Sequence, residues 1–205
     1  MPSKPPLILA FDTSAAHCAA ALLSGDRLLA SVVEPMAKGQ AERLLGLCND
    51  IMADHGHGAG DLAAVGVGIG PGNFTGIRIA VSAARGLALG LGIPAVGVSA
   101  FDALRFGTEG ACACAVDARR DQVFVQVFGA TGLADAPGLH SLSQLPAHDG
   151  PLIGAHGRPP ALPVAEAIAR LTASRFSTTT TRPAPLYLRP ADAAPARDAP
   201  PVILS

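Results

Sequence analysis

The stretch "GVGIGPGNFTGIRIA" occupies residues 66–80, and its interpretation decides the fold of the first half of the chain. Six of its first eleven residues are glycine or proline, between an apolar run at 62–70 and a helix-like pattern after Asn73. Asn73 suits the N-cap position, because its side chain can accept a backbone N–H of the first turn. The stretch therefore predicts a strand, a tight loop and a helix. The loop is either a phosphate cradle or a structural corner.

Both interpretations of the loop have a physical basis. The free N–H groups at a helix start attract anions, and glycines let an anion approach the backbone closely. However, no Gly-Lys-Ser/Thr follows, and Gly66, Gly68 and Gly70 alternate instead of matching the G-x-G-x-x-G spacing. Alternating glycines in a strand more often mean that another backbone packs closely. The residue types favour packing or a partner interface over anion binding, which stays open.

Outward from the loop, the first hundred residues predict alternating elements. Three antiparallel strands are followed by a helix with apolar residues at the 3.6-residue period, and strand and helix then alternate. This order is that of a ribonuclease-H-like lobe, and we assign it to residues 1–105. The predicted strands are 7–12, 17–24, 27–34, 62–70 and 94–99, and the helices are 40–54 and 73–91.

The second half of the chain is less regular. Twelve of the 18 prolines lie from residue 137 onward, so this half is rich in loops. We assign residues 106–190 to a smaller, degenerate C-terminal lobe, 178–181 to a solvated loop and 191–205 to a flexible tail. The predicted elements are strands at 111–118 and 121–130, a helix at 164–176 and an extended segment at 185–190.

Composition excludes several classes of protein. The net charge is −1, lysine occurs only twice and aromatic residues are 4% of the chain, which argues against unaided nucleic-acid binding. No uninterrupted apolar run reaches the roughly 18 residues of a membrane span. The four cysteines form no C-x-x-C pair, so we expect reduced thiols in the cytoplasm.

Four segments together resemble the TsaB (YeaZ-like) family. They are "FDTS" at 11–14, "GIGPGNFTGIRIA" at 68–80, "AVDARRDQVFVQVF" at 115–128 and "PLYLRP" at 185–190, in the family's order. The resemblance covers the whole chain. It implies an α/β fold with two ribonuclease-H-like lobes of the actin-like ATPase (ASKHA) superfamily, here with a reduced second lobe.

The resemblance also implies a function in tRNA threonylcarbamoyladenosine biosynthesis. It implies a partner of the transferase TsaD, which modifies the adenosine next to the anticodon. Our own hypothesis is that the chain is a cytoplasmic, non-catalytic activator of this transferase. TsaE, a P-loop ATPase, is a further implied partner. We expect tRNA to be reached only through the complex, a homodimer when the chain is alone, and no membrane association.

Catalytic and metal-binding residues are expected to be absent. Transferases of the TsaD kind carry two histidines at H-x-x-x-H spacing on the first helix, on one helical face. Here that helix begins "KGQAERLLGL", and Gln40 stands where TsaB relatives commonly keep a histidine. His55 and His57 lie in a glycine-rich loop, where we expect solvent exposure.

Two acidic turns indicate whether the chain can bind a nucleotide. In actin-like ATPases each lobe opens with a strand whose acidic turn faces the phosphates, and Asp12 and Asp117 are the equivalent residues. The turn after Asp117 lacks glycine, so we expect no firmly bound cofactor, with ATP or ADP only at a composite interface. The alternative is a nucleotide-binding ATPase or phosphotransferase acting on its own. The possible residual nucleotide site comprises Asp12, Thr13, Gly70, Gly72, Asn73 and Asp117.

The helices at 40–54 and 73–91 are the expected partner interface. Their small residues leave a smooth surface that would dock the equivalent helices of TsaD as a bundle, and that same surface would pair with itself when the partner is absent. The predicted interface residues are Gln40, Leu44, Leu45, Phe74, Gly76, Ile77, Arg78 and Ala80.

Overall fold

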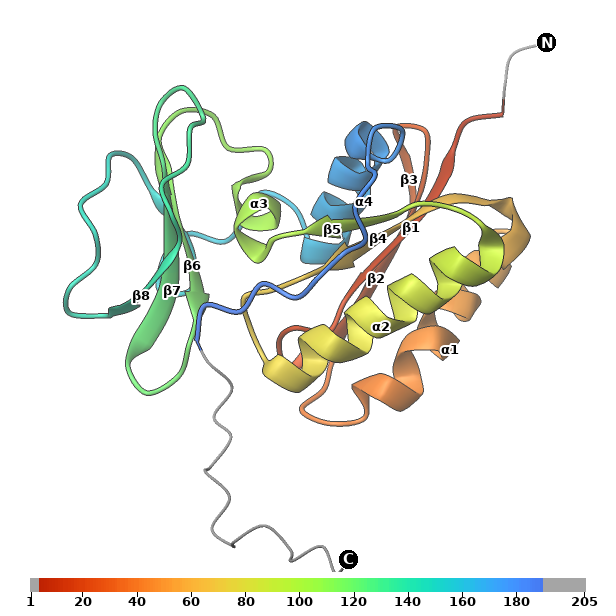
Figure 1. Ribbon diagram of the computed structural model, residues 1–205, viewed down its shortest axis with the longest axis horizontal. Helices are drawn as coiled ribbons and strands as arrows, with labels where there is room; N and C mark the ends of the chain where they lie inside the picture. Colours follow the sequence, from red (N-terminus) through yellow and green to blue (C-terminus); the bar gives the residue numbers. More distant parts are fainter. Residues whose placement is uncertain (1–3, 190–205) are drawn as a thin grey trace, which may run out of the picture.

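The computed structural model describes residues 4–189 as two β-sheets with helices packed on them (Figure 1). The first sheet has the strand order β3-β2-β1-β4-β5. β1, β2 and β3 form an antiparallel meander, and β4 and β5 run parallel to β1. The predicted three-strand meander is therefore confirmed. The strands are β1 (Leu7–Asp12), β2 (His17–Ser24), β3 (Arg27–Pro35), β4 (Leu62–Gly68) and β5 (Ala95–Val98).

β1 is the central strand because both of its faces are apolar. Leu7, Leu9 and Phe11 enter the core on one side of the sheet, and Ile8 and Ala10 enter the core on the other. Successive side chains of a strand point to opposite faces, so an uninterrupted apolar run fits a strand that is covered on both sides. Asp12, the first polar residue, therefore lies at the carboxyl edge of the sheet between its two neighbours.

Two helices cover one face of this sheet (Figure 1). They are α1 (Gln40–Ala53) and α2 (Phe74–Leu91), close to their predicted bounds. Each turns an apolar stripe toward the sheet, as the 3.6-residue period predicts. The stripes share one core with β1 and contain Leu44, Leu47, Ile51, Ile77, Val81 and Ala84.

By length and composition, α2 is the one helix within residues 4–189 that would reach across a membrane. One side of the helix packs on the sheet, whereas the other carries Arg78 and Arg85, which are exposed. This is the pattern of an amphipathic helix on a core.

Helix α4 (Val164–Arg175) covers the opposite face of the first sheet (Figure 1). Its buried residues Ala165, Ile168 and Ala169 share a core with β1 and β2. This helix falls inside residues 106–190, the range predicted for the second lobe, yet it packs on the first. Because its apolar stripe completes the second face of the first sheet, the chain must return to that sheet. The predicted lobe boundary at residues 105 and 106 otherwise stays a prediction.

The second sheet is smaller, with the order β8-β7-β6-β9. β6 (Cys112–Asp117) and β7 (Gln122–Phe128) confirm the two predicted strands, and β8 (Gly138–Ser141) and β9 (Leu152–Gly154) flank them. Helix α3 (Ala100–Arg105) places Phe101 in the core of this sheet. A short 3-10 helix (Ala59–Asp61) precedes β4. Sequence analysis missed α3, β8 and β9, whose three to six residues are too short to show a period.

Two predicted segments end differently in the structure. β4 stops at Gly68, and the chain turns at Gly70, whose φ is 89°. The segment predicted as extended at 185–190 forms no strand over residues 185–189, although Leu186 N–H donates to the Ile69 carbonyl at 2.8 Å. Pro190 and the predicted tail at 191–205 lie outside the described residues.

Candidate functional site

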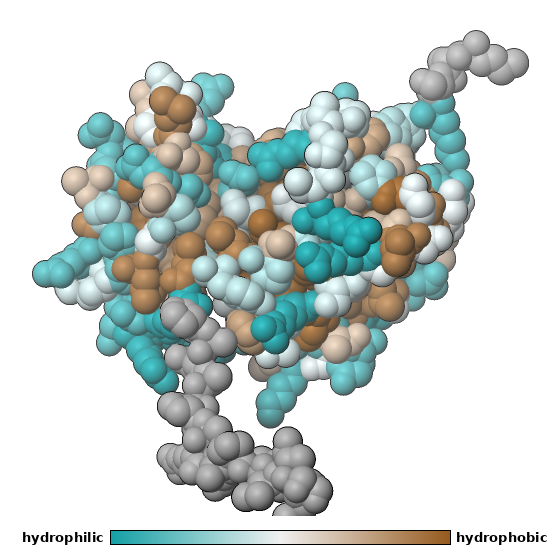
Figure 2. All heavy atoms as spheres, in the orientation of Figure 1, coloured by the Kyte–Doolittle hydropathy of each residue, from teal (hydrophilic) through white to brown (hydrophobic). Residues whose placement is uncertain are grey.

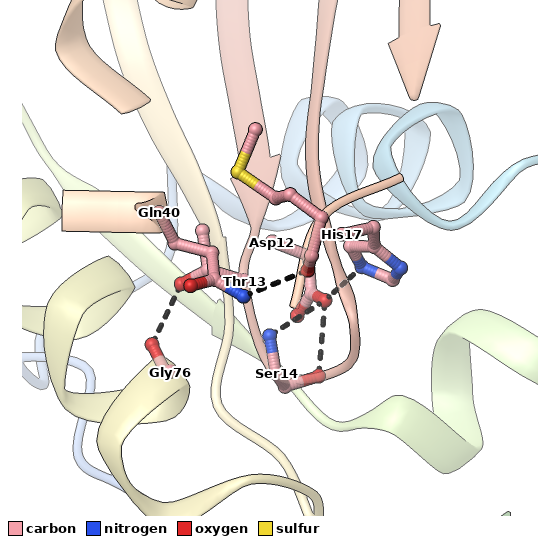
Figure 3. Close-up of polar contacts among 7 residues, drawn as sticks. Asp12, Thr13, Ser14, His17, Gln40 and Gly76 are labelled. Atoms are coloured by element: carbon pink, nitrogen blue, oxygen red, sulfur yellow. Dashed lines mark hydrogen bonds and ion pairs between the residues drawn. The ribbon is translucent and has the colours of Figure 1, made fainter. Parts of the chain in front are cut away.

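The acidic turn after β1 is held by its own atoms (Figure 3). The Asp12 side chain is buried, and its Oδ1 accepts hydrogen bonds from the backbone N–H and the hydroxyl of Ser14, both at 3.0 Å. The same oxygen lies 2.8 Å from Nε2 of His17. Because all three of these neighbours belong to residues 14–17, this carboxylate oxygen stabilises the turn between β1 and β2. Sequence analysis missed His17, although it opens the next strand only five residues after Asp12.

The glycine loop packs directly on this turn. The Thr13 hydroxyl donates to the Gly76 carbonyl at 2.6 Å, and Asn73 N–H donates to the Ser14 carbonyl at 2.6 Å. A Cβ at Gly76 would overlap the Thr13 carbonyl oxygen, and one at Gly72 would overlap that of Ser14. Two backbones therefore meet here without room for side chains. This geometry favours the corner over the phosphate cradle.

The glycines of β4 serve packing in a different way from the one predicted. A Cβ at Gly68 would overlap Oδ2 of Asp12, and one at Gly66 would overlap the hydroxyl of Thr172 on α4. The close neighbours are thus side chains on one face of the sheet, the face that α4 covers, whereas the sequence analysis expected a backbone. Gly70, at the turn, faces Ile77 of α2.

The residues of the possible nucleotide site are only partly brought together. Asp12, Thr13, Gly72 and Asn73 meet at the corner, as described. Asp117 ends β6 in the second sheet, is exposed, and accepts a hydrogen bond from Arg119 N–H at 2.9 Å. Within residues 4–189, no hydrogen bond or ion pair joins Asp117 to the corner. Nucleotide binding stays a prediction.

The predicted interface residues divide into a buried and an accessible group. Leu44, Gly76, Ile77 and Ala80 are buried beneath the helices, and Leu44, Ile77 and Ala80 are at most 1% exposed. The structure does not support the prediction that these four residues contact a partner. They are buried within their own lobe, because the apolar stripe of each helix faces the sheet. Leu45 is 53% exposed, Arg78 is exposed, and Gln40 and Phe74 are half-buried. We call these four residues the α1–α2 face.

A stacked cluster lies at the start of α2. The Arg78 guanidinium is 3.8 Å from the centroid of the Phe74 ring, and its Nε donates to the Tyr187 hydroxyl at 2.9 Å. The Phe74 and Tyr187 rings are 4.9 Å apart and tilted by 31°. Cation–π attraction and ring stacking hold these side chains together at the surface. Sequence analysis missed this cluster, because Arg78 and Tyr187 are 109 residues apart in the chain.

Gln40 begins α1 and bonds within its own loop. Its Nε2 donates to the Met36 carbonyl at 3.1 Å, which ties the helix start to the chain before it (Figure 3). Among residues 4–189 no three His, Cys, Asp or Glu side chains are grouped so that they could hold a metal ion. Nδ1 of His55 lies 2.9 Å from the Ile51 carbonyl oxygen, and Nδ1 of His57 lies 3.8 Å from Oδ2 of Asp61. The absence of a metal stays an expectation.

Comparison with known proteins defines the family. A family profile described as "TsaD: tRNA N6-adenosine threonylcarbamoyltransferase" matches residues 30–139, just over half of the chain. The tRNA threonylcarbamoyladenosine biosynthesis protein TsaB of Escherichia coli is 36% identical over 122 residues, which cover 57% of this chain and 52% of that protein. The match therefore spans about half the length of the curated relative.

Two solved structures from Pseudomonas aeruginosa extend the comparison. One is an uncharacterised protein described as similar to the peptidase YeaZ. It has a TM-score of 0.71 and 24% identity, and the match covers 90% of this chain and all of that one. YeaZ itself has a TM-score of 0.60 and 30% identity, with 69% of this chain and 70% of that one covered. The chain belongs to the TsaB (YeaZ-like) family.

Membership of the TsaB family places the fold in the actin-like ATPase superfamily, as predicted. The two sheets correspond to its two lobes, and the second, with its short outer strands, is the reduced one. The family motif "GPGNFTGIR" forms the corner at the start of α2 and contributes Phe74 and Arg78 to the stacked cluster.

The cysteines of this TsaB-family chain are buried and free. Burial raises the pKa of the Cys18 thiol to about 11 and that of Cys48 to about 12. Burial also raises the pKa of the Cys114 thiol, with a further contribution from neighbouring Cys112. Because the thiolate is the nucleophile, these groups lack the properties of catalytic cysteines.

Proposed function

We propose that the chain is a non-catalytic partner and activator of a TsaD-type transferase in tRNA threonylcarbamoyladenosine biosynthesis. Family membership and the name of the E. coli relative support this pathway. The observation that carries the proposal is the filled corner. At the point where a phosphate would approach the start of α2, the backbone of Thr13 and Ser14 occupies the space next to Gly72 and Gly76. What the two helices still offer a partner is their outer surface.

The α1–α2 face supplies the contacts in this proposal. Leu45 is an exposed apolar side chain on α1, and Arg78 and Phe74 add a fixed cation–π pair on α2. Rigid aromatic and arginine side chains are the residues that most often dominate protein interfaces. A TsaE-type ATPase, tRNA bound through the assembly, and ATP or ADP at a composite interface are further parts of the proposal. So are a cytoplasmic location and a homodimer when the transferase is absent.

Reconstitution tests the proposal. Purified TsaD-type and TsaE-type subunits, threonylcarbamoyl-AMP and tRNA are combined with and without this chain, and modified adenosine is measured. We expect modification only when the chain is present. We expect Leu45→Arg to abolish both co-purification with the transferase and modification, because it replaces an exposed apolar side chain of the proposed docking surface with a charge.

Leu133→Arg is the matched control, because Leu133 is 79% exposed but lies beyond β7 in the second lobe. It should bind and activate like the wild type. Modification that proceeds equally without the chain would refute the activator role. Micromolar binding of magnesium–ATP by the isolated chain, with turnover that Asp12→Ala abolishes, would favour an independent ATPase.

A further inference from the structure

A groove lies beside the C-terminal half of α2, away from the corner. One side is formed by residues 85–95 and the other by residues 179–183, which follow α4. Its volume is about 590 Å³, within the range of roughly 300–1,000 Å³ common for ligand sites. Hydrophilic and hydrophobic surfaces lie next to each other over this part of the molecule (Figure 2). We call it the threonine groove, after Thr179, Thr180 and Thr181.

The groove has an edge of unused backbone groups. Within residues 4–189, the N–H and carbonyl groups of Thr180, Thr181 and Arg182 make no hydrogen bond, and all three residues are exposed. Residues 179–183 form no strand in the free chain and bend at Thr181, but threonine favours extended backbone, and the free N–H and C=O groups can pair with one more strand. The segment is fixed on both sides, because Thr179 N–H donates to the Arg175 carbonyl and the Pro183 carbonyl accepts from Arg85.

The charge of the groove is positive. Among residues 4–189, the charged side chains that line it are Arg85 and Arg182, and no aspartate or glutamate of this range lines it, although the whole chain carries a net charge of −1. Arg85 Nε donates to the Pro183 carbonyl at 2.7 Å, which ties this guanidinium to the opposite side of the groove. Arginine pairs favourably with carboxylates through its fork of N–H groups. A ligand that complements this groove carries negative charge.

The groove also has an exposed apolar residue. Leu89 is 77% exposed at the end of α2, and half-buried Ile93 lies near it in the lining. A simple anion would leave this apolar surface in water, whereas a peptide with alternating side chains would cover it. Free backbone, positive charge and apolar surface together favour a peptide over a phosphate.

We propose that the threonine groove binds an extended acidic peptide segment of a partner protein. The segment pairs as an added strand with residues 180–182, sets carboxylates against Arg85 and Arg182, and covers Leu89. This inference does not depend on the proposed docking of the α1–α2 face, which uses other residues.

The first experiment measures binding by the full-length chain. The probe is a fluorescein-labelled peptide of alternating glutamate and valine, and its lysine–valine counterpart is the negative probe. We expect saturable binding of the acidic peptide alone, weakened by added salt. Arg182→Gln should weaken it about fivefold, the effect of one exposed charge pair near 1 kcal/mol, and Leu89→Ser should weaken it similarly. Arg158→Gln and Leu133→Ser, at exposed positions elsewhere, should leave it unchanged.

The second experiment tests the strand pairing itself. Peptides N-methylated on alternate residues are made in both registers. Pairing predicts that one register fails to bind, and that bound peptide slows amide hydrogen exchange at residues 180–182. Equal binding of both registers overturns the proposal, as does lack of saturation at millimolar peptide. Tripolyphosphate that binds as tightly as the peptide would show an anion site instead, and would also overturn it.

Discussion

Gly76 lies where the first turn of α2 crosses the backbone of Thr13, and the two backbones meet without a side chain between them. A Cβ there would overlap a carbonyl oxygen, which cannot rotate away as a flexible side chain would. The Thr13 hydroxyl and Asn73 N–H both bond across the same gap. The glycine is therefore required by the close approach of two segments, and its conformation alone would not demand it.

The first prediction concerns this contact. Gly76→Ala should destabilise the fold by about 3 kcal/mol, the upper range for overpacking, because α2 must move off the acidic turn. Gly86→Ala is the control on the same helix, since a Cβ there meets no atom within 4 Å. It should stabilise the protein by about 0.5–1 kcal/mol through helix propensity. Urea unfolding measures both, and equal effects would contradict the packing argument.

Single residues also show which contacts can be predicted from the sequence and which cannot. The corner was predictable, because glycine, proline and asparagine have strong local preferences. The partners of Asp12 were not, because His17 reaches its carboxylate only through the turn between β1 and β2. The pairing of Arg78 with Tyr187 joins residues 109 positions apart, which no local pattern can indicate.

At the scale of elements, strong periodicity was the reliable signal. α1, α2 and α4 follow the predicted bounds within a residue or two, because each has a continuous apolar stripe. Periodicity identifies the stripe but does not say what covers it. Leu44, Ile77 and Ala80 were predicted to meet a partner, and they meet the sheet of their own lobe. An apolar stripe on a helix packs first against the core of its own chain.

The second prediction concerns the start of α2. The Asn73 side chain accepts a hydrogen bond from Gly76 N–H at 2.9 Å, as the sequence predicted for an N-cap. Asn73→Ala should cost about 1 kcal/mol in the free energy of unfolding, because one N–H of the first turn loses its acceptor. Asn73→Asp keeps the acceptor and adds a charge that suits the helix dipole, so it should cost nothing. A loss of the same size in both variants would exclude capping as the cause.

At the scale of the molecule, residues 183–189 join the two lobes. Pro183 is buried against Gly97 of β5, and Leu186 N–H donates to the Ile69 carbonyl, so the segment lies on the first sheet. The side chains of Leu186 and Leu188 pack into the core of the second sheet. Arg189 also contacts Gln122 at the start of β7. The sequence analysis predicted that this segment is extended. It did not predict that the segment would pack between the two cores without joining either sheet as a strand.

The last prediction tests whether this segment couples the lobes. Tyr187→Phe removes the acceptor of Arg78 but keeps the ring on Phe74, and should cost about 1 kcal/mol. Tyr187→Ala also removes the stack and should cost about 2 kcal/mol, since an aromatic pair adds roughly 0.5–1.5 kcal/mol. Hydrogen exchange should become faster in β6 and β7 as well as at the start of α2, because the same segment holds both. Leu133→Ala, at a side chain 79% exposed in the second lobe, should change neither measurement. Faster exchange confined to α2 would mean that Tyr187 anchors only the helix, and that the packing of Leu186 and Leu188 alone holds the second sheet in place.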